Sequence, residues 1–274
     1  MVMPEWPEAE HLRKVLNERG CGRNIVSAAV LRPGAVNEPE EKFRRELVGR
    51  QIAIVERRGH HLIFHLDDGN RLLLRLSAGT RLFCGREAPE GQRNFQVIIE
   101  FADESRLFFG GLKAGGLSRL TAKQVLEELK ELGPEPLDAR LSPDVFLERL
   151  SASRGMLKTA LTGQKVVAGI GSRYGDEICY DARIHPGKLV ARLSPDEIGR
   201  LYASMRQVLA EAAAAGGLED KPLFENDRHT GGYREIRKVA DREGEPCPRC
   251  GTKIAKGEVA GRKSHFCPKC QRKD

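Results

Sequence analysis

Four cysteines near the C-terminus have the spacing of a metal site. Cys247 and Cys250 form one Cys-x2-Cys pair, and after sixteen residues Cys267 and Cys270 form a second pair. Four thiolates spaced in this way suit a closed tetrahedral site for one structural Zn²⁺ ion. Two disulfides are the alternative, but nothing else in the sequence indicates an oxidising compartment. We therefore predict a zinc ribbon whose hairpin has its tip at residues 260–263.

The excess positive charge of the chain lies in this cysteine-bearing tail. The chain has 274 residues and a formal net charge of +7. Residues 228–274 contain 13 Lys and Arg against six Asp and Glu, whereas the first 227 residues contain 33 of each kind. A basic zinc module on a neutral body indicates contact with phosphate groups. A solvated basic tail is the alternative, but the cysteines indicate that this tail is folded.

The sequence shows no signal for secretion or for membrane insertion. It contains no apolar run that could span a bilayer and no charged-then-apolar leader. The remaining cysteines, Cys21, Cys84 and Cys179, are scattered, and we expect them to be reduced. These features predict a cytoplasmic protein with no membrane partner.

The elements that position the chemistry begin with a short proline-flanked acidic stretch, Pro4-Glu5-Trp6-Pro7-Glu8. Pro7 suits the first turn of a helix, and Glu8 would lie near the positive end of that helix. We predict a helix over residues 7–19. Residues 23–120 then contain short runs rich in Ile, Val, Leu and Phe, with a hairpin turn at residues 67–70, which favours a β-sandwich. A loop bounded by glycine pairs covers residues 110–116.

The second half of the chain has a helical pattern. Two prolines at residues 134 and 136 indicate a linker, and capped helix starts follow it. The predicted class is a multidomain α+β protein. Its expected parts are an N-terminal β-sandwich domain over residues 1–132, a linker over 133–140, a helical domain over 141–227 and a basic zinc module over 228–274.

Five motifs occur in an order that is typical of one family. They are residues 3–8, residues 132–137, the Val166–Gly171 turn, Ile184-His185-Pro186, and Gly261-Arg262 followed by Cys267-Pro268-Lys269-Cys270-Gln271. Together they resemble the formamidopyrimidine-DNA glycosylase and endonuclease VIII family, over nearly the whole chain. The resemblance implies a β-sandwich with an N-terminal helix, then a helix–two-turn–helix domain that ends in a zinc finger. The chain would be a divergent member.

The resemblance also implies a reaction. An N-terminal proline amine attacks the sugar of a damaged nucleotide, expels the oxidised base and forms a Schiff base, from which the strand is cut as by an AP lyase. Pro4 matches the nucleophile and Glu5 the adjacent acid and base. Glu8 and Glu177 match further acids of the active-site region. The expected partner is damaged, abasic or single-stranded DNA, bound by a monomer beside the bacterial nucleoid.

The DNA-binding residues are also implied by the resemblance. Backbone N–H groups of the turn at Gly169, Ile170 and Gly171 would hold phosphate, and Arg262 would clamp the phosphates beside the lesion. Lys158 and Lys113 match positions at which basic residues face DNA.

Several positions depart from the family pattern. Pro4 is the fourth residue, so its nitrogen is a tertiary amide unless residues 1–3 are absent; Met3 could be the true start, or Val2 could present the amine. His60 replaces a family lysine that contacts phosphate, and Ser172 replaces the usual Asn of the phosphate turn. Ala78 and Ala114 occupy positions where bulky side chains fill the space of the extruded base. These two positions predict a preference for single-stranded or abasic substrates, with little dependence on the opposite base.

Two other functions remain compatible with the sequence. A catalytically degenerate paralogue could hold damaged or abasic DNA without excision. A zinc-ribbon protein could instead bind RNA or a transcription complex, but the N-terminal motif argues against this interpretation.

Overall fold

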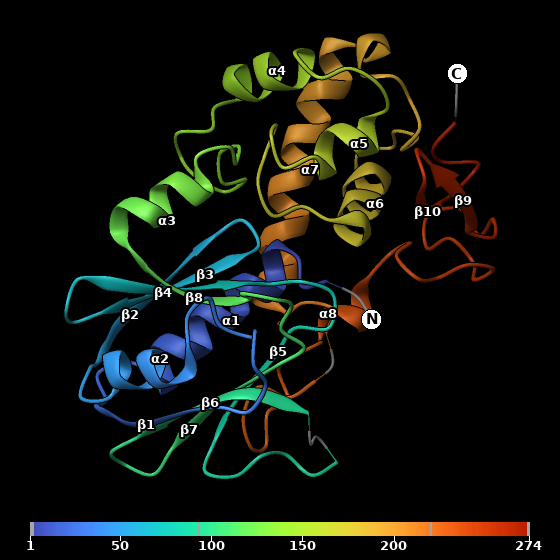
Figure 1. The fold of residues 1–274 in the computed structure, drawn as a ribbon. Helices are drawn as coiled ribbons and strands as arrows, with labels where there is room; N and C mark the ends of the chain where they lie inside the picture. Colours follow the sequence, from blue (N-terminus) through green and yellow to red (C-terminus); the bar gives the residue numbers. More distant parts are fainter. Residues whose placement is uncertain (1–2, 92–93, 220, 273–274) are drawn as a thin grey trace. The chain divides into compact units, whose positions relative to one another are not determined.

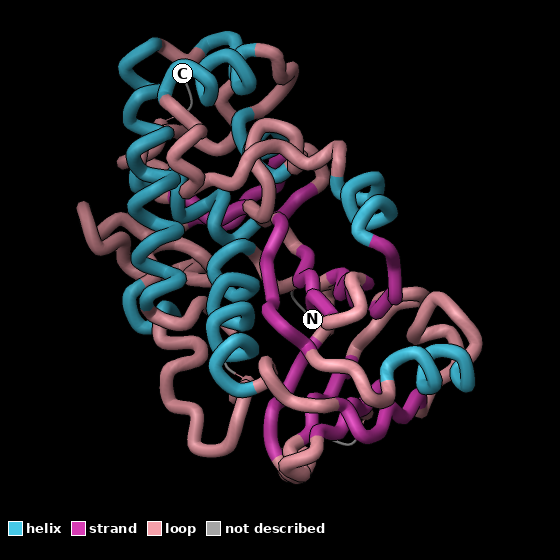
Figure 2. The backbone as a smooth tube through the Cα atoms, turned by 90° about the vertical axis from the view of Figure 1, so that its left-hand side faces the viewer, coloured by secondary structure: helices cyan, strands magenta, loops and turns pink. Residues whose placement is uncertain are grey.

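The fold is that of a computed structural model, which describes residues 3–91, 94–219 and 221–272 (Figure 1). The chain divides into two compact units. The first unit consists of Met1–Lys130 and Gly216–Gly232, and the second of Glu131–Ala215 and Tyr233–Asp274. Figure 2 shows that strands dominate the first unit and helices the second. This division differs from the expected domains, because residues 216–232 belong with the N-terminal unit and the zinc module belongs with the helical one.

The first unit contains two four-stranded antiparallel sheets. One sheet has the order β1-β6-β7-β5 and the other the order β2-β3-β4-β8. The strands are β1 (Ile25–Val30), β2 (Ile52–Arg58), β3 (His61–Leu66), β4 (Asn70–Arg75), β5 (Arg81–Gly85), β6 (Phe95–Phe101), β7 (Arg106–Gly110) and β8 (Leu117–Thr121). The predicted sandwich is confirmed. The strands β5 and β8 have the weakest sequence pattern, since each is five residues long and carries polar residues among its apolar ones.

Three helices accompany these sheets. They are α1 (Trp6–Arg19), α2 (Glu40–Leu47) and α3 (Ala122–Leu129). Glu5 is the N-cap of α1, and the Glu8 carboxylate accepts the Glu5 backbone N–H at 2.8 Å, which satisfies a donor at the helix start. The predicted helix at residues 7–19 is therefore confirmed to within one residue.

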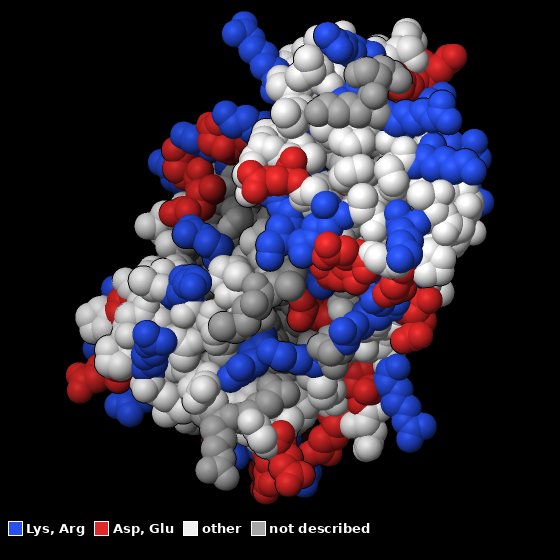
Figure 3. Space-filling model, turned by 90° about the vertical axis from the view of Figure 1, so that its right-hand side faces the viewer, with Lys and Arg blue, Asp and Glu red and all other residues white. Residues whose placement is uncertain are grey.

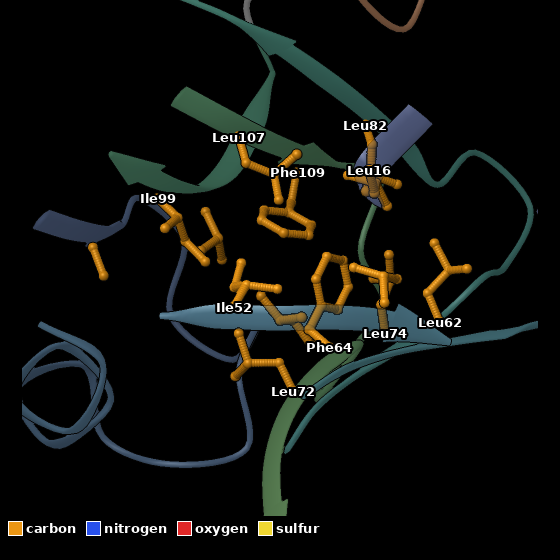
Figure 4. Close-up of a cluster of buried hydrophobic side chains, with 14 of the residues drawn as sticks. Leu16, Ile52, Leu62, Phe64, Leu72, Leu74, Leu82, Ile99, Leu107 and Phe109 are labelled. Carbon is orange, nitrogen blue, oxygen red and sulfur yellow. The ribbon is translucent and has the colours of Figure 1, made fainter. Parts of the chain in front are cut away.

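The core of the first unit lies between the two sheets. Phe64 of β3 and Phe109 of β7 meet edge to face with ring centroids 6.0 Å apart (Figure 4). Both rings are fully buried, as are Leu72 of β4 and Ile99 of β6. The apolar alternation along the strands is thus what closes the sandwich.

The segment Gly216–Gly232 is held by backbone and side-chain contacts within the first unit. The Cys84 N–H of β5 donates to the Leu223 carbonyl at 2.7 Å, and Leu223 joins the hydrophobic core. His11 of α1 lies 2.8 Å from the Thr230 hydroxyl. These contacts explain why a domain boundary at residue 227 does not describe the fold.

The second unit is built from helices and a two-stranded ribbon. The helices are α4 (Pro143–Ser151), α5 (Leu157–Thr162), α6 (Ser172–Asp181), the 3-10 turn η1 (Val190–Arg192), α7 (Pro195–Ala214) and α8 (Tyr233–Ile236). Ser142 and Ser194 cap α4 and α7, and each has proline at the first helical position, as the sequence predicts. No helix within the described part of the chain is long and apolar enough to cross a membrane.

The ribbon consists of β9 (Ala255–Val259) and β10 (Arg262–Phe266). Ala260 and Gly261 connect them, and both have positive φ, as a two-residue hairpin turn of the type I′ class requires. Arg262 is consequently the first residue of β10, directly after the tip.

Burial predicts opposite outcomes for one substitution at two leucines. Leu72 is fully buried in the core, whereas Leu126 of α3 is 73% exposed. We expect Leu72→Ala to lower the free energy of unfolding of the first unit by about 2–5 kcal/mol, because it leaves a cavity. Leu126→Ala is expected to change it by about 0.5 kcal/mol or less. Urea denaturation of both variants checks this, and equal losses would contradict the position of the core.

Candidate functional site

The acidic stretch at the start of the chain forms a buried cluster at the N-terminus of α1. Pro4 is buried and Glu5 is 2% exposed. The Glu8 carboxylate accepts the Glu5 N–H through one oxygen, and its other oxygen accepts the Leu218 N–H at 2.7 Å. Glu8 therefore positions the backbone at Glu5 and ties it to the segment Gly216–Gly232.

Gly217 makes this close approach possible. It has φ +74°, and a Cβ at this position would lie 2.6 Å from the Glu8 Oε1 atom. Any other residue would push the Glu8 carboxylate away and strain its own backbone. The contact between Glu8 and Leu218 thus depends on glycine at position 217.

The turn between β2 and β3 lies beside the same helix start. Arg57 places its guanidinium 4.4 Å from the centroid of the Trp6 ring and pairs with Glu10 at 3.0 Å. His60, in this turn, is 8% exposed, and its carbonyl accepts the Leu76 N–H at 2.9 Å. Pro4 and Glu5 thus lie at the start of α1, and His60 lies in the turn between β2 and β3. The contact between Trp6 and Arg57 joins these two parts of the first unit.

Two loops of the first unit carry the small residues noted in the sequence. Ala78, Lys113 and Ala114 are all exposed. The loops are packed against each other, since a Cβ at Gly111 would lie 1.8 Å from the Gly79 carbonyl oxygen. The buried Gln96 amide bonds both the N–H and the carbonyl of Leu112, at 2.6 and 3.2 Å. The glycine-bounded loop at residues 110–116 is thus anchored at Leu112.

The turn before α6 is the expected phosphate site of the second unit. Gly171 is the N-cap of α6, so the first N–H groups of that helix follow it directly. The Gly169 N–H, however, donates to the Gln164 Oε1 atom at 2.7 Å, and the Gln164 amide also donates to the Ile170 carbonyl. Gly169 consequently shapes the turn, with φ +85°, and does not offer its N–H to a ligand, contrary to the prediction.

Arg262 lies at the same end of α6. Its Nη1 atom donates to the Thr162 hydroxyl at 2.6 Å, while its side chain remains exposed. The Ser172 hydroxyl donates to the Lys263 carbonyl at 3.0 Å. Arg262, Ser172 and the start of α6 are therefore held together within one unit.

Lys158 does not face solvent, contrary to the prediction. Its side chain is 0% exposed, and the ammonium group donates to Asp176 at 2.7 Å and to the Lys263 carbonyl at 2.5 Å. Asp176 also accepts the Ser264 hydroxyl and the His265 N–H. A lysine charge can be buried here because a carboxylate and a carbonyl replace its hydration. Lys158 thus attaches β10 to α5 and α6.

Glu177 is a structural acid in this fold. It is 1% exposed, and its carboxylate accepts the N–H groups of Lys238, Val239 and Ala240 at 2.7–3.1 Å and the Tyr233 hydroxyl at 3.3 Å. Burial raises the pKa of Glu177, and the N–H donors oppose this rise. In the structure this carboxylate fixes the chain that leads to the ribbon, and its place among the active-site acids stays a prediction.

The four cysteines converge as a metal site requires. Their sulfur atoms all lie within 4.8 Å of one another, with Cys247 to Cys270 at 4.0 Å and Cys250 to Cys267 at 3.5 Å. Zn–S bonds of about 2.3 Å in a tetrahedron place sulfurs about 3.8 Å apart. These residues fit one structural zinc.

Several positioning residues were not singled out by the sequence analysis. Gln164 and Gln96 bond backbone groups and Thr162 accepts from the Arg262 side chain, and neither kind of contact leaves a pattern in the sequence. Asp176 had a usable signal, because an acid among buried-type residues of a predicted helix needs a cationic partner.

Comparisons with known proteins agree with this geometry. The profile of the formamidopyrimidine-DNA glycosylase N-terminal domain matches residues 3–117, and that of its H2TH domain matches residues 132–221. A zinc finger found in FPG and IleRS matches residues 244–272. The formamidopyrimidine-DNA glycosylase of Pelotomaculum thermopropionicum is 35% identical over 98% of this chain and 99% of its own. The chain belongs to the formamidopyrimidine-DNA glycosylase family.

Other members extend this agreement. The glycosylase of Symbiobacterium thermophilum is 38% identical over 98% of this chain and 89% of its own. A structure of Lactococcus lactis Fpg with DNA containing an abasic site is 32% identical, has a TM-score of 0.89, and covers 98% of this chain and 100% of that one. A complex of a single-residue mutant of that protein with Fapy-dG DNA has a TM-score of 0.90. This family member is therefore a DNA glycosylase of base excision repair with a C-terminal zinc finger.

The cysteine cluster predicts one zinc ion per chain. We expect native mass spectrometry to find one zinc in the wild-type glycosylase and none in Cys267→Ala, because three thiolates hold the ion less tightly than four. Cys179→Ala is the matched control, since Cys179 is a buried thiol of the second unit outside the cluster. Protein purified without metal, or with Cys247 and Cys250 in disulfides, would contradict the assignment.

Proposed function

We propose that this glycosylase excises oxidised bases through a Schiff base at an N-terminal amine and then cuts the strand as an AP lyase. The observation that carries the proposal is the buried Glu5 directly after Pro4, held in place by Glu8. Glu5 would protonate the sugar ring oxygen and relay protons during elimination. His60 would donate to a phosphate in place of the family lysine.

The proposed nucleophile is the Pro4 nitrogen, freed by removal of the residues before it. A secondary amine forms a cationic iminium that accepts electrons during elimination, whereas a tertiary amide is not nucleophilic. Val2, the alternative amine, lies outside the described residues. The Pro4 amine requires a chain that begins at Pro4, whereas the Val2 amine requires a chain that begins at Val2.

A chain that begins at Pro4 is expected to form a borohydride-trappable complex with abasic DNA. The chain that begins at Met1 is expected to trap poorly through Pro4. In the Pro4 form, Glu5→Gln is expected to reduce base excision by about 10²–10⁴-fold, the range of general acid catalysis. The control is Glu18→Gln, an exposed acid of the same helix.

Single-turnover kinetics and mapping of the trapped peptide check these expectations. Equal trapping by both forms, with the cross-link at a lysine, would identify that lysine as the nucleophile. Trapping of the longer form alone, with the cross-link at Val2 after loss of Met1, would identify the Val2 amine. Tight binding of abasic DNA without trapping by either form would favour the degenerate paralogue.

We also propose that the start of α6 and Arg262 bind the DNA phosphates beside the lesion. The contacts of Ser172 and Arg262 with Lys263 and Thr162 support this assignment, because they bring a helix N-terminus and an exposed guanidinium together. Gly171 contributes as the N-cap, and Lys113 as an exposed cation of the first unit. On the face drawn in Figure 3, Lys and Arg alternate with Asp and Glu, which favours a few placed contacts over a uniformly basic surface.

The substrate form follows from the anchored loops of the first unit. Extruding a base from a duplex leaves a gap, and unstacking requires a few kcal/mol. Ala78 and Ala114 are exposed but present only methyl groups, which cannot replace the stacking surface of a base. We therefore propose a preference for single-stranded, abasic or otherwise unpaired substrates. We propose in addition that the protein is a monomer and that it acts at the bacterial nucleoid.

Restoring bulk at position 114 is expected to shift this preference. Ala114→Phe is predicted to raise the single-turnover rate on a paired lesion relative to the same lesion in single strand, since an aromatic ring can fill the gap. The matched control is Ala102→Phe, at an exposed alanine that follows β6. A wild-type preference for the paired lesion, or no dependence on position 114, would refute the idea.

A further inference from the structure

Tyr180 connects the last turn of α6 to the cysteine cluster. Its hydroxyl oxygen lies 3.3 Å from the Cys247 sulfur, and the residue is 2% exposed. Tyr180 and Cys247 belong to one buried cluster with Val239, Ile254 and Cys267. The phenol on α6 therefore contacts a sulfur of the zinc module directly, within a cluster of buried side chains.

The direction of this hydrogen bond follows from the chemistry of the metal site. A zinc-bound cysteine is a thiolate, which has no proton to donate. The tyrosine hydroxyl carries the proton that the thiolate lacks. Tyr180 is consequently the donor and Cys247 the acceptor when zinc is bound.

Arg249 fixes the phenol in this position. It lies in the Cys-x2-Cys turn that begins at Cys247, and its Nη1 atom donates to the Tyr180 carbonyl at 3.0 Å. Its guanidinium carbon is 4.3 Å from the centroid of the Tyr180 ring. A cation over the ring is attracted to the π electrons, so the ring is held between the ribbon and its own helix.

We propose that Tyr180 is a positioning residue of the zinc centre, whose hydroxyl donates to the Cys247 thiolate, slows zinc release and shields this sulfur from electrophiles. A donor to a metal-bound thiolate draws charge away from the sulfur and fixes its orientation, as partners outside the ligand set do at other metal sites. Among the four ligands, Cys247 is the one on which Tyr180 acts. The effect is therefore specific to one sulfur.

The test compares Tyr180→Phe with the wild-type protein, both as full-length, zinc-loaded chains. We expect transfer of zinc to an excess of a colorimetric chelator to be about tenfold faster in Tyr180→Phe, the scale of one hydrogen bond to a charged group. With limiting N-ethylmaleimide, alkylation of Cys247 relative to the other three cysteines is expected to rise above its wild-type value, as mapped by peptide mass spectrometry.

Tyr202→Phe is the matched control, because the Tyr202 hydroxyl donates to the Leu141 carbonyl at 2.7 Å in the same unit. It is expected to leave zinc transfer and the alkylation order unchanged. Unchanged zinc transfer in Tyr180→Phe overturns the proposal. Equal acceleration of alkylation at all four cysteines also overturns it, since that pattern indicates general opening of the ribbon. If Tyr180→Phe does not fold, Arg249→Gln replaces it, with an expected acceleration of about threefold.

Discussion

The arrangement of the second unit depends on the buried ion pair between Lys158 and Asp176. The Lys158 ammonium also bonds the carbonyl of Lys263, and Asp176 also binds two groups of β10. A buried pair of this kind has little net advantage over apolar packing, but loss of one partner leaves an unpaired charge and destabilises a fold by about 3–5 kcal/mol. The pair thus enforces one register of the ribbon against α5 and α6. This register also sets the positions of Arg262, which is in β10, and of Ser172, which bonds the Lys263 carbonyl of β10.

Two further carboxylates hold backbone segments of the fold. Glu8 binds N–H groups of two chain segments, and Glu177 binds three consecutive N–H groups and a phenol. Carboxylates suit this work because each oxygen accepts more than one donor and the charge strengthens every bond. The result is that separate chain segments are tied to one another at buried positions within each unit. Helix α6 contributes Glu177 to this frame, and Tyr180 at its end contacts Cys247.

Much of this architecture could be predicted from the sequence. Periodicity and turn residues located the sandwich, most helices and the hairpin of the ribbon, and cysteine spacing located the metal site. The burial of Lys158 and Glu177 could not be predicted, and it decides their roles. Lys158 pairs with Asp176, 18 positions away, and Glu177 accepts N–H groups about 60 positions away. Gly169 fitted the motif, but a glutamine side chain with no sequence signal occupies its N–H. Sequence patterns describe which residue types occur together; they do not give the tertiary contacts that determine which groups remain available.

The segment Gly216–Gly232 gives the chain an unusual order of assembly. The first unit is discontinuous: its sheets are encoded by the first 130 residues, but its last segment follows all of α7. On a ribosome, the backbone partners of Glu8 and Cys84 therefore emerge only after most of the second unit has been synthesised. The buried Glu5 cluster is completed late, when the helices are already available to fold. A nascent or truncated chain that ends before residue 216 would thus carry the sandwich without the Leu218 contact that fixes Glu8 and without the Leu223 contact to β5.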